Sequence, residues 1–345
     1  MQNKIKNIID KSLKNYIRYL DNRYSLSKIS PVLFRHIAEF ITRDGKRVRP
    51  TLLVAGYLGF AKKKAPNLYK TALSIELLHD FMLVHDDIID KSDTRRGKPS
   101  MHKMLGNYLK RFKNIKFSGQ DLAIVSGDVM YAMAIDTFLS IKENMQRKEK
   151  ALKQFIQAAV FTGMGEFIEL IGGTKDIAKI TKEDINKIYD YKTAHYTFAC
   201  PLSTGAILAG ARQKQTGILY KYGIYLGRAF QIKDDIIGLF GKEKKIGKSN
   251  LTDLQEAKKT LLIWYAFKNS GKKTRQKIRK ILGKNNVNKK DLLEIRGIIV
   301  ESGALDFARK EVSVLIKKAK AALKASDIHP KQKAFLEQYS QKLLN

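Results

Sequence analysis

The sequence has one cysteine, few prolines and half as many acidic residues as basic ones. Cys200 cannot form an internal disulfide, and its apolar surroundings, TFACPLSTGA, favour a small buried residue over a nucleophile. Six prolines in 345 residues allow long uninterrupted helices. No run of about 18 uncharged apolar residues is present, and the N-terminus lacks the apolar segment of a signal peptide. We therefore expect a soluble, cytoplasmic protein without a transmembrane segment.

The charge balance is strongly basic. Sixty-six Lys and Arg residues against 33 Asp and Glu residues give a net charge of +33, which would attract nucleic acid, anionic membrane or phosphorylated small molecules. Lysine runs such as 62–64, 242–245 and 317–324 are typical of solvated helix faces. A nucleic-acid-binding helical protein is one alternative, and it would show strongly salt-dependent affinity. Charge by itself favours it little, so we expect no specific nucleic acid.

Apolar residues recur at the three- and four-residue spacing of helices along most of the chain, and strand signals are nearly absent. The predicted helical segments are 2–20, 31–43, 51–60, 67–91, 120–142, 149–172, 181–209, 215–240, 254–269, 288–299 and 303–344. No repeat or low-complexity linker interrupts them. This pattern predicts an all-α fold, with residues 1–345 in a single domain whose helices pack around a central cavity.

An apolar helical run ends in aspartates and arginines over residues 79–100, HDFMLVHDDIIDKSDTRRGKPS. Asp86 and Asp90 lie one turn apart at the C-terminal end of that helix, where the helix dipole disfavours further negative charge. Mg²⁺ would offset their repulsion, because it takes oxygen ligands and commonly bridges carboxylates to substrate phosphates. Arg95 and Arg96 follow at once, and guanidinium groups bind phosphate oxygens in bidentate fashion. The alternative is a helix end with solvated charges.

A second aspartate cluster, FQIKDDIIGLFGKEKKIGKSNLTDL, occupies residues 230–254. It places Asp234 and Asp235 on another apolar helix, with Gln231 three residues before Asp234 and Lys248 in the segment beyond. Two facing aspartate helices could hold one metal–diphosphate complex.

With both clusters in place, the chain resembles the trans-isoprenyl diphosphate synthases, all-α prenyltransferases that include farnesyl and geranylgeranyl diphosphate synthases. The resemblance covers roughly residues 40–265, followed by C-terminal helices over 270–345. It is carried, in order, by GKRVRP (45–50), the 79–100 stretch, SGDVMYAMA (126–134), YKTAHYTFACPLSTGA (191–206), FQIKDDIIGLFG (230–241) and GKSNLTDLQEAKKTLL (247–262). The segments YTFACPL and DDIIGLFG are most similar to those of geranylgeranyl diphosphate synthases.

The resemblance implies a magnesium-dependent 1′-4 condensation. An allylic diphosphate ionises, isopentenyl diphosphate attacks the cation, and a proton leaves, with the released diphosphate as the implied base. By the family pattern, Asp86 and Asp90 hold two Mg²⁺ ions and Asp234 a third, while Asp87 and Asp235 support them. A homodimer is also implied.

The resemblance further implies which residues contact each substrate. Those implied at the allylic diphosphate are Arg95, Lys192, Gln231 and Lys248, and those implied at isopentenyl diphosphate are Lys46, Arg49, His79 and Arg96. Thr193, together with Lys192, is implied to stabilise the carbocation by its oxygen dipoles, so that Lys192, Thr193 and Gln231 form the catalytic set.

Phe81 and Met82 are expected to limit product length, because in this family the growing tail ends just upstream of the first aspartates. Their bulk favours a C20 product, with the C15 product of a farnesyl diphosphate synthase as the alternative. Two departures from the family pattern stand out. Gly238 occupies the place of a frequent third aspartate, and Glu166 and Glu169 stand where Gln and Asp are common.

Two other readings remain. A class I terpene cyclase also ionises a prenyl diphosphate with aspartate-bound Mg²⁺, but the basic GKRVRP and RRG motifs argue for a second diphosphate site that a cyclase lacks. A catalytically silent partner subunit is disfavoured by two intact aspartate motifs. The sequence does not indicate the preferred allylic starter or the role of the basic surface.

Overall fold

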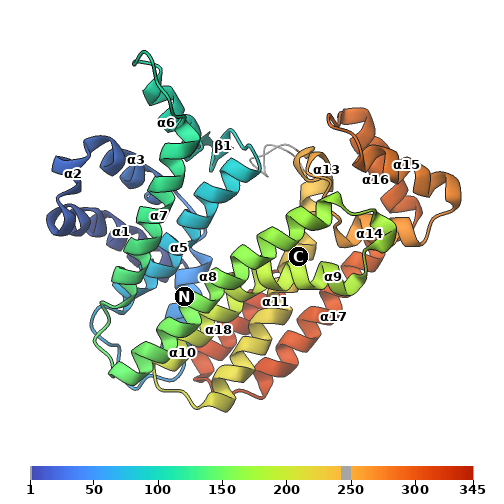
Figure 1. Cartoon of the computed structure of the whole chain (residues 1–345). Helices are drawn as coiled ribbons and strands as arrows, with labels where there is room; N and C mark the ends of the chain where they lie inside the picture. The colour runs from blue at the N-terminus through green and yellow to red at the C-terminus, as the bar shows by residue number, and fades with distance from the viewer. Residues whose placement is uncertain (1, 242–249, 345) are drawn as a thin grey trace. The chain divides into compact units, whose positions relative to one another are not determined.

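Figure 1 shows the computed structural model of the protein, which describes residues 2–241 and 250–344. The first elements are α1 (Gln2–Tyr24), α2 (Leu26–Ile29), α3 (Pro31–Ile41), α4 (Val48–Leu58), α5 (Leu68–Ile89), β1 (Thr94–Arg95), β2 (Lys98–Pro99), α6 (Met101–Leu109) and α7 (Gly119–Phe138). They are followed by α8 (Met145–Thr174), η1 (Ile177–Lys179), α9 (Lys182–Ile188), η2 (Tyr189–Ala199), α10 (Cys200–Leu208) and α11 (Gln213–Phe240). The last are α13 (Thr252–Gln255), α14 (Leu261–Lys268), α15 (Lys272–Leu282), α16 (Lys289–Glu301), α17 (Ala304–Lys324) and α18 (Pro330–Gln341).

The described chain divides into two compact units. The first comprises Met1–Lys153 with Thr204–Gly210, and the second comprises Gln154–Ser203 with Ala211–Asn345. Within the described residues the strands are β1 and β2, two residues each, which pair antiparallel with Thr94 opposite Pro99. The predicted all-α fold is therefore confirmed, whereas the single domain and the central cavity stay predictions.

In the first unit, α5 is the central helix and packs against α1, α4 and α7. Residues 71–78 are all buried, so the helix is covered on every face over two turns. A helix enclosed in this way needs apolar residues all round, and any charged side chain on it must find a partner inside the protein. Glu76 and Asp80 are such side chains.

In the second unit, α11 packs against α17 and η2. Leu219, Tyr222 and Leu226 form part of its buried face, and the Tyr222 hydroxyl donates a hydrogen bond to the carbonyl oxygen of Leu336 at 2.8 Å. This bond fixes α18 against α11, because a buried hydroxyl without a partner would be costly. Figure 1 shows α11 and α17 running side by side.

Three predicted helical segments divide in the structure. The segment 181–209 divides into α9, the π-helix η2 and α10, the segment 254–269 covers α13 and α14, and the segment 303–344 divides into α17 and α18 before Pro330. Helices α2, α6 and α15 were not predicted at all. The reason for α15 is its sequence, KKTRQKIRKIL, in which only Ile278 and Ile281 are buried, so the apolar signal is weak.

One helix, α8, is long and apolar enough to cross a membrane by length and composition alone. Only 22% of its most apolar window is buried, and one such helix is weak evidence for a membrane span. Two of its residues, Glu166 and Glu169, form ion pairs with Lys192. The helix therefore has one face that carries charges and another that is apolar.

Candidate active site

The first aspartate pair lies at the C-terminal end of α5, as the spacing predicts. Asp86 is in the last turn, and Asp90 is the residue that caps the helix. A carboxylate oxygen of each lies within 4.8 Å of the other, and both side chains are partly exposed. Two carboxylates at this separation, on the negative end of a helix dipole, suit a hard divalent cation with oxygen ligands.

Arg95 is held beside this pair by the neighbouring aspartate. Its Nε donates to Oδ1 of Asp87 at 2.8 Å, and its Nη2 lies 3.3 Å from Oδ2 of Asp86. The Asp87 side chain is fully buried, and burial raises its pKa to about 6 even though Arg95 lowers it. Asp87 is thus a partner for Arg95 inside the protein, and the role expected for it at the metal site stays a prediction.

A second group of arginines rests on the acidic residues within α5. Nη1 of Arg47 lies 2.6 Å from Oε1 of Glu76, and Nη2 of Arg96 lies 3.1 Å from Oδ1 of Asp80. Arg96 is also 3.6 Å from Glu76. Burial raises the pKa of Asp80 to about 7, while the charge of Arg96 opposes this shift. These pairs hold two guanidinium groups at the same part of α5.

The other residues expected at isopentenyl diphosphate lie in the same unit. Lys46 is exposed in the segment before α4, and Arg49 is in the first turn of α4. Burial and the guanidinium groups of Arg49 and Arg96 hold the pKa of His79 well below its usual range, which keeps the imidazole neutral. A neutral imidazole can donate one hydrogen bond to a phosphate oxygen without adding charge.

The sequence reasoning missed Arg47, Glu76 and Asp80. Arg47 has a left-handed backbone, with φ 47°, immediately before α4, and this turns its side chain into the protein interior, where it is almost fully buried. The signal that could have revealed the acidic pair was their position. They stand one turn apart inside an otherwise apolar helix, and such charges are normally paired.

In the second unit, Lys192 lies on the π-helix η2 and forms ion pairs with Glu166 and Glu169 of α8, the two residues that depart from the family pattern. Its Nζ is 2.6 Å from Oε2 of Glu166 and 2.5 Å from Oε2 of Glu169. Gly165 allows this approach, because a Cβ at that position would come within 2.3 Å of the backbone nitrogen of Lys192. The extra carboxylate of Glu166 is therefore matched by a cation.

Thr193 and Gln231 belong to a hydrogen-bond chain that ends in the core. The Thr193 hydroxyl donates to Oε1 of Gln231 at 2.7 Å, and Nε2 of Gln231 donates to Oδ1 of Asp235 at 2.9 Å. The Tyr189 hydroxyl donates to the other oxygen of Asp235 and accepts from the backbone nitrogen of Leu261 at 3.0 Å. Burial raises the pKa of Asp235 well above its usual range. The chain fixes the rotamers of Thr193 and Gln231.

The remaining residues of the second cluster lie near the end of α11. Asp234 is exposed, and Gly238 follows one turn later. A Cβ at Gly238 would meet the carboxylate of Asp253 at 2.9 Å, so Asp253 occupies the space beside the glycine. Lys248 lies outside the described residues, and its predicted role stays untested.

Phe81 packs in an aromatic group of the first unit. Its ring centroid is 4.7 Å from that of His85 and 5.1 Å from that of Tyr131 on α7. Met82 is next to it on α5 and is partly exposed. Tyr131 supplies a second aromatic ring at this level, which the sequence reasoning did not include.

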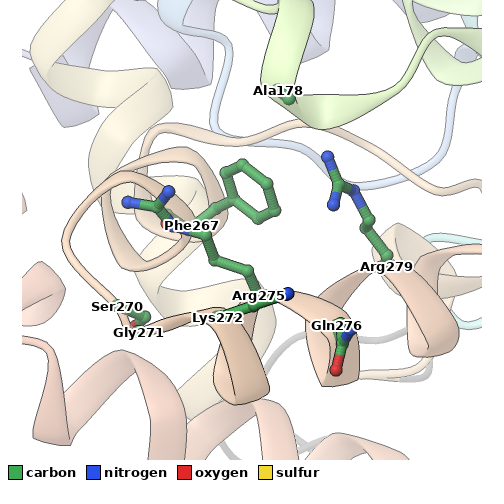
Figure 2. Close-up of a pocket in the computed structure, with 8 residues that line it drawn as sticks. All are labelled: Ala178, Phe267, Ser270, Gly271, Lys272, Arg275, Gln276 and Arg279. Carbon is green, nitrogen blue, oxygen red and sulfur yellow. The ribbon is translucent and has the colours of Figure 1, made fainter.

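A hollow of about 520 Å³ lies in the second unit and is shown in Figure 2. The guanidinium carbons of Arg275 and Arg279 lie 5.6 Å and 5.2 Å from the ring centroid of Phe267. None of the residues predicted at the active site lines it. Its lining consists of Ala178, Phe267, Ser270, Gly271, Lys272, Arg275, Gln276 and Arg279.

Comparisons with known proteins identify the family of the chain. A profile of the family described as Polyprenyl synthetase matches residues 30–299. The geranylgeranyl diphosphate synthase of Saccharolobus solfataricus is 30% identical over 339 residues, covering 93% of this chain and 94% of that protein. The geranylfarnesyl diphosphate synthase of Aeropyrum pernix is 32% identical over 298 residues, covering 82% and 84% respectively.

A solved structure shares the whole fold. It is the geranylgeranyl pyrophosphate synthase of Corynebacterium glutamicum, complexed with isoprenyl diphosphate and magnesium. The similarity has a TM-score of 0.90 at 25% identity and covers 100% of this chain and 99% of that one.

Proposed function

The chain belongs to the polyprenyl synthetase family and is a short-chain trans-prenyl diphosphate synthase, and from this we propose that it makes geranylgeranyl diphosphate from isopentenyl and allylic diphosphates. The observation that carries the proposal is the acidic end of α5. Asp86 and Asp90 lie within 4.8 Å of each other, and Arg95 is held beside them by Asp87. This donor set combines oxygen ligands for a metal with a fixed cation for a phosphate.

The residues present fit magnesium. Asp86 and Asp90 would hold ions in the first unit and Asp234 would hold another in the second, for three in all. Bound magnesium would neutralise the negative charge that develops on the leaving diphosphate, and so would stabilise the transition state more than the ground state. The oxygen-only ligand set favours magnesium over softer metals.

Arg95 and Lys192 would bind the allylic diphosphate. Each is fixed before substrate arrives, Arg95 by Asp87 and Lys192 by the two glutamates of α8. A cation that is already oriented loses little conformational entropy on binding, so more of its interaction is available to the developing charge.

Thr193 and Gln231 would act at the allylic carbon. The hydroxyl proton of Thr193 is donated to Gln231, so the oxygen lone pairs of Thr193 are left to face a developing positive charge. Gln231 is in turn held by Asp235. We assign stabilisation of the carbocation to the dipole of this hydroxyl, with Lys192 beside it in the chain, and proton removal to the released diphosphate.

Lys46, Arg49, His79 and Arg96 would bind isopentenyl diphosphate. This site needs no metal, because cationic side chains supply the counter-charge. Arg96 lies beside the buried carboxylates of α5, so its position depends on α5 as well as on its own segment.

We also propose a homodimer, for which the exposed apolar face of α8 is the support. Val160, Met164, Phe167 and Ile171 recur at helical spacing and are between 46% and 66% exposed. Apolar side chains at this spacing form one stripe, and a continuous exposed stripe is typical of a surface that a protein partner covers.

The decisive experiment compares the wild type with Asp86→Ala. The purified protein is incubated with isopentenyl diphosphate, Mg²⁺ and each short allylic starter, and the dephosphorylated products are sized by chromatography. We expect a C20 product from the wild type and a loss of at least about 100-fold in turnover for Asp86→Ala, with an unchanged circular dichroism spectrum.

The control is Asp306→Ala on α17, since Asp306 has a side chain 85% exposed and lies outside the predicted site. It should retain wild-type turnover. Full activity in Asp86→Ala would remove the metal assignment, and a main product of 15 or 25 carbons would replace the C20 assignment.

A further inference from the structure

The turn between α6 and α7 carries the sequence KRFKNIKF over residues 110–117, and every residue in it is exposed. Three of these are large apolar side chains, Phe112 at 49%, Ile115 at 37% and Phe117 at 53% exposure. Apolar side chains at the tip of a surface turn contribute nothing to the packing of the core. Several of them exposed together mark a surface that binds a partner outside the chain.

Four cations alternate with these apolar residues: Lys110, Arg111, Lys113 and Lys116. The sequence contains no Asp or Glu between Asp93 and Asp121. Asp93 is paired with Lys103 at 2.7 Å, and Asp121 caps α7 through Ser118. Within the described residues, no carboxylate forms an ion pair with the four cations of the turn.

The base of the turn is closely packed and capped. Ser118 and Asp121 form a capping box at the start of α7, and a Cβ at Gly119 would come within 2.4 Å of the backbone nitrogen of Gly106 on α6. Tyr108 also holds the near side, since its ring centroid lies 5.4 Å from that of Phe112 and 4.6 Å from the guanidinium carbon of Arg111. In Figure 1 the turn lies at the free end of the α6–α7 hairpin.

We propose that residues 110–117 form a membrane-docking turn that binds the surface of an anionic lipid bilayer. Apolar side chains enter the boundary between headgroups and acyl chains, while lysine and arginine extend to the lipid phosphates. Charge complementarity selects this occupant, because the turn is purely cationic and a bilayer offers negative charge directly above an apolar layer.

The proposal goes beyond the proposed function and does not depend on it. It fits that function, since a prenyl product of 20 carbons partitions into bilayers, and a synthase docked there would release it beside the bilayer. Nucleic acid is the rival occupant, because phenylalanine can stack on bases and lysine can contact phosphates. Ile115 offers a base no stacking surface, and the bilayer accounts for all three apolar side chains.

The test is vesicle co-sedimentation of the full-length protein. We expect binding to vesicles of phosphatidylcholine with about 30% phosphatidylserine and none to phosphatidylcholine alone. Replacing all four cations of the turn by Gln should weaken binding on the order of 600-fold, at about fivefold for each cation. The triple variant F112S/I115S/F117S should weaken it at least about tenfold.

A matched control removes the same charge elsewhere. K310Q/K317Q/K318Q/K324Q takes four exposed lysines from α17 and leaves the turn intact, so its affinity for anionic vesicles should stay close to that of the wild type. If this control weakens binding as much as the turn variant does, attraction depends on net charge alone and the proposal is overturned.

A fluorescence experiment reports on insertion directly. Trp264 is the single tryptophan, so the variant Phe112→Trp in a Trp264→Phe background places the only indole in the turn. Its emission should shift to the blue with anionic vesicles and be quenched by brominated lipids, and the absence of both changes would overturn the proposal.

Three further results would also overturn it. The wild type could fail to bind any vesicle, it could bind single-stranded RNA through the turn and no vesicles, or the triple Ser variant could change the oligomeric mass. The last would make the turn a contact between copies of the chain. Turnover of water-soluble substrates should be the same in the turn variants as in the wild type, which shows that they are folded.

Discussion

Glu76 and Asp80 are acidic residues on a helix that is otherwise apolar over the same turns. Each carboxylate is almost fully buried, and each lies next to an arginine, Arg47 at 2.6 Å from Glu76 and Arg96 at 3.1 Å from Asp80. Removing one partner of such a pair leaves an uncompensated buried charge, which costs about 3–5 kcal/mol. At the residue scale, the positions of Arg47 and Arg96 depend on these two acids.

Asp80 is expected to give stability a pH dependence of its own. Its pKa is raised from 3.8 to about 7, chiefly by burial, so the folded state binds the proton more tightly than the unfolded state does. The contribution of Asp80 to the free energy of unfolding therefore falls as pH rises from about 4 to 7. The variant Asp80→Asn should lack this pH-dependent contribution to the free energy of unfolding.

Urea unfolding of both proteins at pH 5, 6 and 7 measures the effect. The difference in free energy of unfolding between Asp80→Asn and the wild type should move in favour of the variant as pH rises. A difference that stays constant across this range would show that Asp80 does not change its protonation there.

Phe81 and Tyr131 are expected to limit product length together, because their rings pack 5.1 Å apart beside the aspartate helix end. Phe81→Ala should shift the main product to a longer chain, and Tyr131→Ala should shift it in the same direction. The double variant should give a longer main product than either single variant. Chromatography of dephosphorylated products measures this.

Leu139→Ala is the control, since Leu139, the residue that follows α7, is exposed and outside the aromatic group. It should leave the product distribution as it is in the wild type. An unchanged distribution in both aromatic variants would place the limit on chain length elsewhere.

At the element scale, the π-helix η2 carries Lys192 and Thr193 and is closely packed by glycines. Gly165 of α8 faces the backbone of Lys192, and Gly227 of α11 faces Ala194, whose Cα would lie 2.4 Å from an added Cβ. π-Helical turns are rare and occur frequently at functional sites. Two helices that approach this closely hold the catalytic segment in position through its backbone.

Gly165→Ala tests that packing. The new methyl group would lie 2.3 Å from a backbone nitrogen, so α8 and η2 must separate, and we expect a destabilisation of about 1–3 kcal/mol with a clear loss of kcat. Gly163→Ala is the matched control, two residues earlier on the same helix with open space around it. It should be neutral or stabilising by up to about 1 kcal/mol, because Ala favours helix over Gly. Equal effects of the two variants would refute the role of the close approach.

At the scale of the whole molecule, two kinds of surface call for partners, the apolar stripe of α8 and the basic surface. The proposed homodimer would cover the apolar stripe. Phe167→Glu places a charge in the stripe and should halve the mass measured by size-exclusion chromatography with light scattering, because desolvating an unpaired carboxylate in an interface is unfavourable.

Leu293→Glu on α16 is the control for that experiment. Leu293 is also a large exposed apolar residue, 64% exposed, but it does not belong to the stripe on α8. Its variant should keep the mass of the wild type. If the Phe167→Glu protein keeps the mass of the wild type, the stripe on α8 is not the dimer interface.

The all-α fold, the family and the identity of most proposed site residues could be read from the sequence. Helical spacing brings Asp86 and Asp90 to the same end of one helix, and the spacing depends only on backbone geometry. Turn residues marked most boundaries. Helix α15 could not be predicted, because its buried side is two isoleucines among cations.

Only the tertiary structure decided which charges are paired. That Glu166 and Glu169 meet Lys192, that Glu76 meets Arg47, and that Tyr131 meets Phe81 depends on contacts between segments far apart in the chain. The sequence determined by itself which side chains each helix presents, since local spacing and residue chemistry are sufficient for that. Packing decided their partners, because burial and distance arise only when the helices meet.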